Sequence, residues 1–402
     1  MKNLQMNFKP IILLLLIGFA FSSCSSDDDP IDEPTTGLET KLLACNSFQS
    51  NNVDAILLLE NRNDGVDYII DCVVSVEVDL KIEPGVVIEF TDGSGMNIRS
   101  GGSLIAEGTQ NKMITFTAET KQKGAWKGVI SSSQSVRNRL DYVTMEYAGG
   151  GQLSSNFEPA ILTLERDATF KLNNVTIKNS LNYGFVATSR GYNMELNNVT
   201  ISDCDIPAYV VTNVVSDISG GDFTGNTTDV IRLSAGTNGA IGTSQTWKNL
   251  SVPYRTAHDI IIVDGAQLTL EPGLTLEFED NIGLELDKIF DDGSSIVAVG
   301  TPTEPITFTG ATKQAGAWKS LSIRRTSSLF TEFNNVIIEY AGGSGAGGAI
   351  GMWVNPVLTV TNTTFKDING CALFNKYNPT NPNLTQSNNT TENVSGGLLC
   401  GE

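Results

Sequence analysis

Residues Leu80–Phe90 read LKIEPGVVIEF, and residues Leu268–Phe278 read LTLEPGLTLEF. Three further motifs, ITFT, GAWK and EYAGG, follow both copies in the same order. They begin at Ile114, Gly124 and Glu146 after the first copy, and at Ile306, Gly316 and Glu339 after the second. The offset between copies is 188 residues at the Glu-Pro-Gly motif and 192 to 193 at the later motifs. Few residues are inserted or lost, so the chain reads as one structural unit present twice.

A shorter period lies inside each copy. Residues Leu172–Ile177 read LNNVTI, and the same six letters return at Leu196–Ile201, 24 residues later. About two dozen residues with two or three short strands are typical of one turn of a stacked β-coil. Apolar residues that alternate along each strand, such as Leu140 and Tyr142, are expected to point inward. We expect the Asn pairs at the corners, where Asn tolerates left-handed backbone and can bond to the Asn of the next turn.

The Glu-Pro-Gly motif has a local explanation. Pro fixes φ at the first corner position of a tight turn, and Gly supplies the positive φ that a type II turn requires. Pro84-Gly85 and Pro272-Gly273 are therefore expected to turn the chain between strands. The duplication of Glu83 and Glu271 favours a structural role for both.

The first residues resemble a bacterial lipoprotein signal. Lys2 and Lys9 precede the apolar run Ile11–Phe21, and Ser22-Ser23-Cys24 follows. This arrangement predicts cleavage before Cys24 and lipidation of its side chain, although Phe21 stands where Leu is usual; an ordinary secretory signal is the alternative. The Ser/Asp run that follows resembles the export tether of surface lipoproteins in the Bacteroidota. We therefore expect an outer-membrane, lipid-anchored protein at the cell surface.

Composition fits an extracellular β-rich protein. Removal of the leader leaves 24 basic residues against 45 acidic ones, a net charge of −21. Such a charge argues against nucleic acid and anionic lipid as partners. The chain has 39 Gly, and its apolar residues lie in short runs, as expected for many short strands joined by turns.

Lipidation of Cys24 would leave five cysteines in an oxidising compartment. Cys45 and Cys72 precede the first copy, and Cys371 and Cys400 end the second, so we predict that each pair is a disulfide that holds one end of the coil. Cys204 follows an expected strand without a nearby His, which favours a small buried side chain over a nucleophile.

The repeated motifs together resemble the right-handed parallel β-helix proteins of the pectate-lyase-like superfamily. The resemblance covers about residues 66 to 375 and implies an all-β, single-stranded right-handed parallel β-helix, a solenoid with two long internal repeats. The expected organisation is a signal peptide (1–23), a Ser/Asp-rich tether (24–40), an N-terminal cap (41–79), a first repeat (80–267), and a second repeat with a C-terminal cap (268–402).

The enzymes of that superfamily are marked by residue sets that this chain matches poorly. The only His, His258, lacks the flanking Gly residues of the hydrolases, and Asp291-Asp292 lies in a Gly/Ser turn without the remaining motifs. Lyase members need clustered carboxylates for Ca²⁺ and an Arg or Lys base. Arg137, Arg139, Arg324 and Arg325 supply bases, and Glu277, Glu279 and Asp280 supply acids, without a distinguishing spacing. We predict no catalytic set and no required cofactor, with Ca²⁺ left open.

Duplicated aromatic residues suggest binding instead. Trp126-Lys127 and Trp318-Lys319 occupy matching places, so they are candidate ligand-binding residues that stack on sugar rings or on a protein partner. Because both Trp residues are duplicated, packing in the core is the favoured alternative for them. The Gly-rich loops 149–156 and 342–348 interrupt the coil rhythm, and function on solenoids tends to lie on such loops. We expect non-catalytic binding of a polysaccharide or an extracellular protein. A polysaccharide lyase or glycoside hydrolase and a structural envelope protein are the alternatives.

Overall fold

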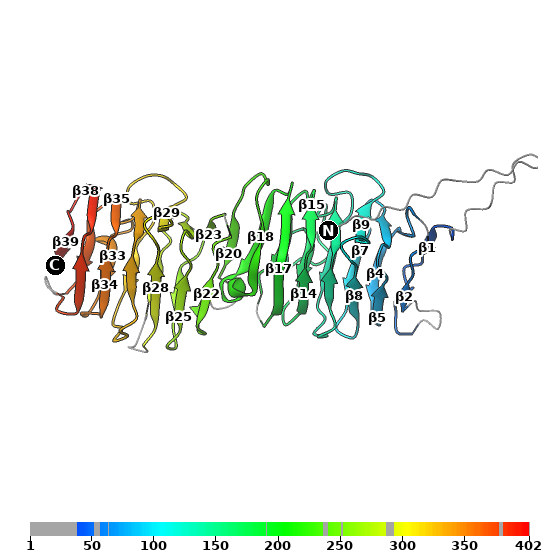
Figure 1. The fold of residues 1–402 in the computed structure, drawn as a ribbon, viewed down its shortest axis with the longest axis horizontal. Coiled ribbons are helices and arrows are strands. Elements are labelled where there is room, and N and C mark those ends of the chain that lie inside the picture. Colours follow the sequence, from blue (N-terminus) through cyan, green and yellow to red (C-terminus); the bar gives the residue numbers. More distant parts are fainter. Residues whose placement is uncertain are drawn as a thin grey trace, which may run out of the picture. The chain divides into compact units, whose positions relative to one another are not determined.

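The computed structural model describes residues 38–401, except 52–56, 63, 190, 236–239, 251, 287–292 and 378–380. Residues Leu38–Glu402 form one compact unit, which holds the whole described core. The signal peptide, Cys24 and Asp291-Asp292 lie outside the described residues. Every strand pairing between named strands is parallel, and strands that pair with each other are never consecutive along the chain (Figure 1). The protein is therefore a parallel β-solenoid of about 13 turns.

One sheet of 13 strands, here called the continuous sheet, contributes one strand to every turn. Its strands are β4 (Val73–Val76), β7 (Gly95–Ile98), β10 (Val129–Ser131), β13 (Ala160–Leu164), β16 (Tyr183–Ala187), β18 (Ile206–Val211), β20 (Ile231–Ser234), β23 (Tyr254–Thr256), β26 (Thr275–Phe278), β29 (Ile306–Gly310), β32 (Val336–Glu339), β35 (Thr364–Ile368) and β38 (Thr390–Val394).

The other faces of the N-terminal half belong to a second sheet, here called the bent sheet. The long strand β17 (Asn193–Ser202) joins its two arms, because its first part pairs with β14 and its last part with β15. One arm contains β2 (Leu58–Leu59), β5 (Asp79–Ile82), β8 (Ser103–Glu107), β11 (Arg139–Asp141) and β14 (Thr169–Asn173). The other contains β1 (Lys41–Leu43), β3 (Tyr68–Ile70), β6 (Val87–Phe90), β9 (Ile114–Ala118), β12 (Val143–Glu146) and β15 (Thr176–Lys178), and β19 (Ile218–Asp222) pairs with β17.

Two shorter sheets replace the bent sheet in the C-terminal half. The seven-stranded sheet contains β21 (Ala240–Ile241), β24 (Ile260–Ile262), β27 (Leu284–Leu286), β30 (Leu321–Ile323), β33 (Gly348–Met352), β36 (Cys371–Asn375) and β39 (Leu399–Gly401). The six-stranded sheet contains β22 (Gln245–Trp247), β25 (Gln267–Leu270), β28 (Ser295–Val299), β31 (Glu332–Asn334), β34 (Leu358–Thr361) and β37 (Leu384–Ser387). The 3₁₀ helix η1 (Thr212–Asp217) lies between β18 and β19, where the halves meet.

In-register stacking explains the core. Along the continuous sheet, Val74, Met96, Val129, Leu162 and Phe185 are successive partners, and all are buried. Strands of neighbouring turns lie about 4.8 Å apart, so each inward side chain packs on the inward side chain of the next turn. Because each turn covers its neighbour, burial of apolar surface stabilises the stack as a series of nearest-neighbour contacts.

The corner prediction for Asn is confirmed. Asn174 and Asn198 both have positive φ, and Asn198 Nδ2 donates to Asn174 Oδ1 at 2.6 Å. In the second half Asn335, Asn362 and Asn388 take the same conformation, and Asn388 Nδ2 donates to Asn362 Oδ1 at 3.3 Å. The expectation that Tyr142 points inward is wrong. Its φ is 50°, which makes it a corner residue like the Asn residues, while Leu140 is buried as expected.

The Glu-Pro-Gly turns also have the predicted backbone, with φ of 90° at Gly85 and 79° at Gly273. Asn249 Nδ2 donates to the Pro272 carbonyl oxygen at 3.2 Å, which ties that turn to the preceding one. The strands that follow the two motifs belong to different sheets: β6 to the bent sheet and β26 to the continuous sheet. Matching sequence motifs therefore lie on different faces of the coil.

Strand pairing extends beyond the expected range of 66 to 375, from Lys41 to Gly401. In the last turn the inward positions become polar: Thr391 pairs with Phe365, and Gln386 pairs with Val360. Both polar side chains are exposed. A polar final turn covers the core without presenting a new apolar surface to water.

Candidate functional site

Trp126, a candidate binding residue, is fully buried. Its indole ring stacks on Phe90 with ring centroids 3.9 Å apart and an angle of 8° between the planes. The indole Nε1–H donates to the Glu146 carbonyl oxygen at 2.8 Å. No face of this ring is free to stack on a sugar, so the structure assigns it to packing.

Trp318 has the same environment. It is fully buried, stacks on Phe278 at 4.4 Å and donates from Nε1 to the Glu339 carbonyl oxygen at 2.8 Å. Packing in the core, which the duplication favours, is therefore confirmed for both Trp residues, and neither is an exposed stacking platform.

The two lysines next to these Trp residues differ. Lys319 Nζ lies 2.9 Å from Asp259 Oδ2, so its charge is held in an ion pair. Lys127 lines a cavity of about 380 Å³ together with Asp92, Thr120 and Lys123. Trp126 also borders this cavity, but it is fully buried, so Lys127 is the candidate residue with a partly exposed side chain there.

Both predicted disulfides are confirmed. Cys45 bonds to Cys72, and Cys371 bonds to Cys400, with Cα–Cα distances of 5.9 Å and 6.1 Å. Each bond joins the terminal turn of the solenoid to the turn beside it, as expected for staples at the ends of the stack.

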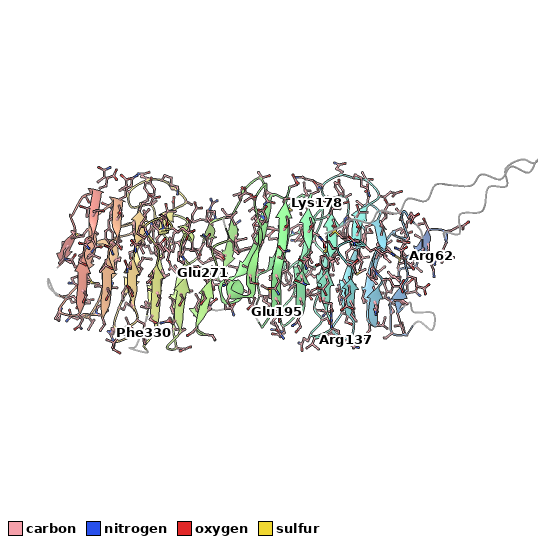
Figure 2. All side chains as sticks on the ribbon, viewed as in Figure 1. Arg62, Arg137, Lys178, Glu195, Glu271 and Phe330 are labelled. Carbon is pink, nitrogen blue, oxygen red and sulfur yellow. A yellow bond between two sulfur atoms is a disulfide. The ribbon has the colours of Figure 1, made fainter. Side chains whose placement is uncertain are left out.

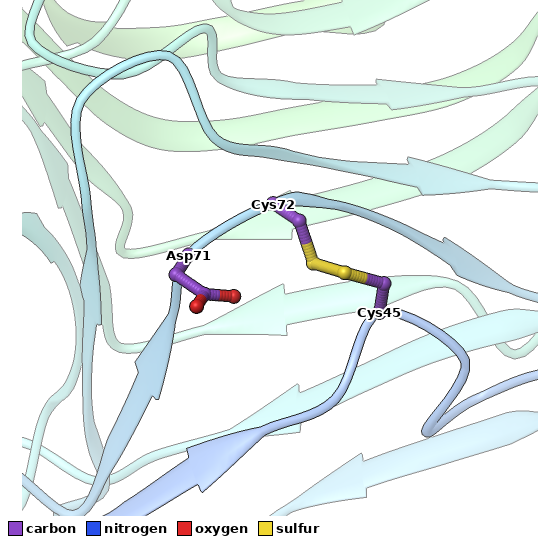
Figure 3. Close-up of side chains that lie close together, drawn as sticks. All are labelled: Cys45, Asp71 and Cys72. Carbon is purple, nitrogen blue, oxygen red and sulfur yellow. A yellow bond between two sulfur atoms is a disulfide. The ribbon is translucent and has the colours of Figure 1, made fainter.

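Figure 3 shows Asp71 beside the first of these disulfides. Within the part of the chain that the structure describes, Cys45, Asp71 and Cys72 are the one group of three potential metal-ligand side chains that converge. Both sulfur atoms are consumed in the disulfide, so the group offers a single carboxylate and does not form a metal site.

Cys204 is buried, and burial raises the pKa of its thiol to about 11. Its Sγ lies 3.2 Å from the Ser202 carbonyl oxygen. At neutral pH it is a thiol rather than a thiolate, which agrees with a packing role.

Several of the acids and bases noted as lyase candidates form ion pairs with other side chains of neighbouring turns. Arg139 lies 2.9 Å from Glu107, and Arg255 lies 2.7 Å from Glu277. The one His, His258, sits in a turn where its backbone N–H donates to Thr256 Oγ1 at 3.1 Å. These pairs align charges along the stack rather than around a common reacting atom.

A larger hollow lies at the corner that follows β10, β13 and β16. Those strands are neighbours in the continuous sheet, so the residues just after them stack on one another. The hollow, here called the corner pocket, measures about 550 Å³. It is lined by Ser132, Asn156, Phe157, Glu165, Arg166, Thr188 and Ser189.

The Gly-rich loop after Glu146-Tyr147 forms one wall of the corner pocket. Asn156 and Phe157 line the pocket from this loop, and Leu153 and Phe157 also lie against the outer face of the sheet beside Ile130 and Thr163. Ile130 and Thr163 are buried although their positions face outward. The loop is therefore packed onto the sheet, and its place beside the pocket is fixed by apolar contact.

Tyr192 holds the opposite side of the corner. Its hydroxyl accepts from the Ser189 backbone N–H at 2.7 Å and donates to the Leu164 carbonyl oxygen at 3.0 Å. Burial raises the pKa of Tyr192, so the hydroxyl keeps its proton and its donor role. Glu165 and Arg166, directly after Leu164, are thereby presented from a fixed backbone.

Sequence reasoning singled out the loop but not the remaining lining residues. Ser132, Glu165 and Thr188 come from three successive turns and share no motif. The signal that could have found them is the stacking register, because each of these three residues directly follows a strand of the continuous sheet. That register becomes visible only when the strand ends are known.

No family model and no solved structure matches the chain. A local similarity joins it to the Protein bark beetle of Drosophila melanogaster, 43% identical over 54 residues. The match covers 13% of this chain and 2% of that protein, so it shows no family. The described residues also contain no helix with the length and hydropathy needed to cross a membrane.

Proposed function

We propose that this protein is a surface lipoprotein that binds a polysaccharide, or a protein partner, without catalysis. In this proposal Cys24 carries the lipid, the chain is anchored in the outer membrane and exposed to the medium, and the solenoid is a right-handed β-helix built from two copies of one unit. The matching environments of Trp126 and Trp318 support the duplication. The corner pocket is the observation that carries the binding function.

The chemistry of the corner pocket favours a saccharide. Its size falls in the range of small-ligand sites, about 300–1,000 Å³. Ser132, Thr188 and Ser189 offer hydroxyl groups, and Asn156 offers both a donor and an acceptor. Phe157 adds an aromatic surface, which suits the apolar face of a sugar ring.

Binding is favoured over hydrolysis by the acids at the pocket. A glycoside hydrolase commonly places two carboxyl groups on either side of the scissile bond. Among the described residues that line the corner pocket, Glu165 is the one carboxylate, and Arg166 directly follows it. A Ca²⁺-dependent lyase remains the second candidate, and the test below separates it.

The test uses the soluble chain from Ser25 onward with a panel of neutral and acidic glycans, with and without Ca²⁺. Retention without bond cleavage supports the proposal. Glu165→Gln and Asn156→Ala should each weaken retention about tenfold, the loss of one or two hydrogen bonds to a bound ligand. Glu392→Gln, an exposed carboxylate on the last turn, is the matched control and should change nothing.

Turnover that Ca²⁺ switches on would replace binding with a lyase activity. Neither retention nor cleavage would leave a structural envelope role. The proposed lipid anchor is tested separately. Cys24→Ala should release the protein from the detergent phase, and a variant that stays in the detergent phase would refute lipidation.

A further inference from the structure

Three loops of the second half stack at one corner of the coil. They are residues 324–331 after β30, 353–357 after β33, and 376–377 after β36, here called the cationic corner. Backbone bonds tie them together: Trp353 N–H donates to the Ile323 carbonyl oxygen at 2.9 Å, and Lys376 N–H donates to that of Met352 at 3.0 Å. These loops therefore form one continuous surface.

Large apolar side chains are unusually exposed on the cationic corner. Leu329 is 81% exposed, Phe330 67%, Val354 52% and Tyr377 67%. Phe330 lies at the lower edge of the second half in Figure 2. Leu329 and Phe330 are adjacent in the longest loop, so they form an apolar tip.

The charge of this corner is opposite to that of the whole chain. Its three loops contain Arg324, Arg325 and Lys376 and no Asp or Glu, in a protein with a net charge of −19. Arg324 lies 3.9 Å from Glu285 of β27, which offsets part of its charge, while Arg325 is exposed. Residues 287–292, which follow β27, lie outside the described residues.

Trp353 organises the cations. Arg324 lies over its ring at 5.2 Å and Lys376 at 5.8 Å, and Tyr377 meets it edge-on with centroids 5.6 Å apart. Cation–π contact holds both charges beside the aromatic pair. Trp126, Trp247 and Trp318 are fully buried, so Trp353 is the one Trp of this chain with a partly exposed side chain.

We propose that the cationic corner docks onto the surface of an anionic lipid membrane. Apolar tips that enter the acyl boundary, Trp and Tyr at the headgroup level, and Arg and Lys beside the phosphates are the features of an interfacial membrane contact. The net charge of the chain argued against anionic lipid, but that average conceals this local excess of positive charge.

The form of the patch favours a membrane over the other occupants. Exposed Leu329 and Val354 offer nothing to a polysaccharide, which would use aromatic rings and cations alone. A protein interface places its apolar residues at the centre of a packed patch. Here the most exposed apolar residues are at the loop tip, which suits insertion into a soft medium.

The experiment uses the soluble chain from Ser25 onward, whose core lies wholly within the compact unit, and vesicles of phosphatidylcholine with or without about one third phosphatidylglycerol. We expect sedimentation with the anionic vesicles and a blue shift of Trp fluorescence that is lost in Trp353→Phe. Leu329→Ser with Phe330→Ser should reduce binding about tenfold or more, and Arg325→Gln about fivefold. High salt should weaken the binding of the wild-type protein.

Val136→Ser is the matched control, because Val136 is an apolar loop residue 70% exposed after β10 of the first half. It should bind vesicles like wild type, and circular dichroism should show that every variant is folded. Failure to bind either vesicle, or binding that survives the Leu329 and Phe330 changes, would overturn the proposal. Retention on dextran sulfate without vesicle binding would overturn it in favour of an anionic polymer, and retention on an acidic protein alone would do so in favour of a protein partner.

Discussion

Replacement of Trp126 by Ala tests whether this residue binds or packs. The ring is fully buried and stacked on Phe90, and its N–H bonds to the Glu146 carbonyl oxygen. Removing a buried aromatic side chain costs about 3–5 kcal/mol, and the lost hydrogen bond adds about 1 kcal/mol. We therefore expect Trp126→Ala to destabilise the protein by about 5 kcal/mol. Trp126→Phe retains a ring against Phe90 and should cost about 2 kcal/mol.

The stability of a solenoid is a sum of local and nearest-neighbour contributions, so the loss should be concentrated in the turns around Trp126. Urea unfolding gives the total effect, and amide hydrogen exchange shows whether β6, β9 and β12 lose protection first. Trp353→Ala is the control, since that side chain is only partly buried and should cost less. Trp126→Ala with unchanged exchange and unfolding, but with weaker glycan retention, would refute the packing argument and restore the binding role.

The two disulfides, Asp217 and Cys204 give separate tests. Cys45→Ala and Cys371→Ala each remove a disulfide, between cysteines that are 27 and 29 residues apart in the sequence, respectively. Each change should lower the free energy of unfolding by about 3 kcal/mol and cause early amide hydrogen exchange in the terminal turn. Unchanged exchange would show that the disulfides do not stabilise the terminal turns. Burial, with a smaller contribution from Glu195, raises the pKa of Asp217 from 3.8 to about 6. The native state therefore holds an extra proton between these values, and stability falls as pH rises through that window. Asp217→Asn should raise the free energy of unfolding by about 2 kcal/mol at pH 7 and leave it unchanged at pH 3, after allowance for the partial exposure of Asp217. Equal unfolding midpoints of the variant and the wild-type protein at both pH values would contradict this. Cys204 should resist a thiol reagent until the chain unfolds, and fast labelling of the native protein would show that its burial is transient.

Much of the fold could be predicted from local chemistry. Gly85 and Gly273 have the positive φ that the Pro-Gly turns require, and the corner Asn residues bond between turns as expected. Both disulfides follow from the positions of their cysteines at the ends of the repeat. These features depend on a few adjacent residues or on one repeated spacing, and such information is present in the sequence itself.

The candidate site could be predicted only in part. The Gly-rich loop was recognised because it interrupts a regular spacing, and it does form a wall of the corner pocket. The sequence left the Trp residues as candidates for binding or for packing, because an aromatic residue in a short segment carries no sign of which way it faces. Phe90 covers Trp126 from a strand about 36 residues earlier in the chain, so its burial is a property of two turns together.

Only the tertiary structure shows which residues meet at a corner of the coil. It also shows which sheet each repeated strand joins in the two halves. Both halves have loops at the matching corner. In the first half Ser132, Glu165 and Thr188 line a hollow, whereas in the second half Arg324 and Lys376 lie over the ring of Trp353. The strands after the two Glu-Pro-Gly motifs also join different sheets, because the chain passes through η1 and β19 before the second half begins. The sequence by itself determined the turn, its corners and its staples, since these are local. The stacking register determines the corner pocket and the cationic corner, because each of these surfaces is made of side chains that lie some two to three dozen residues apart in the sequence.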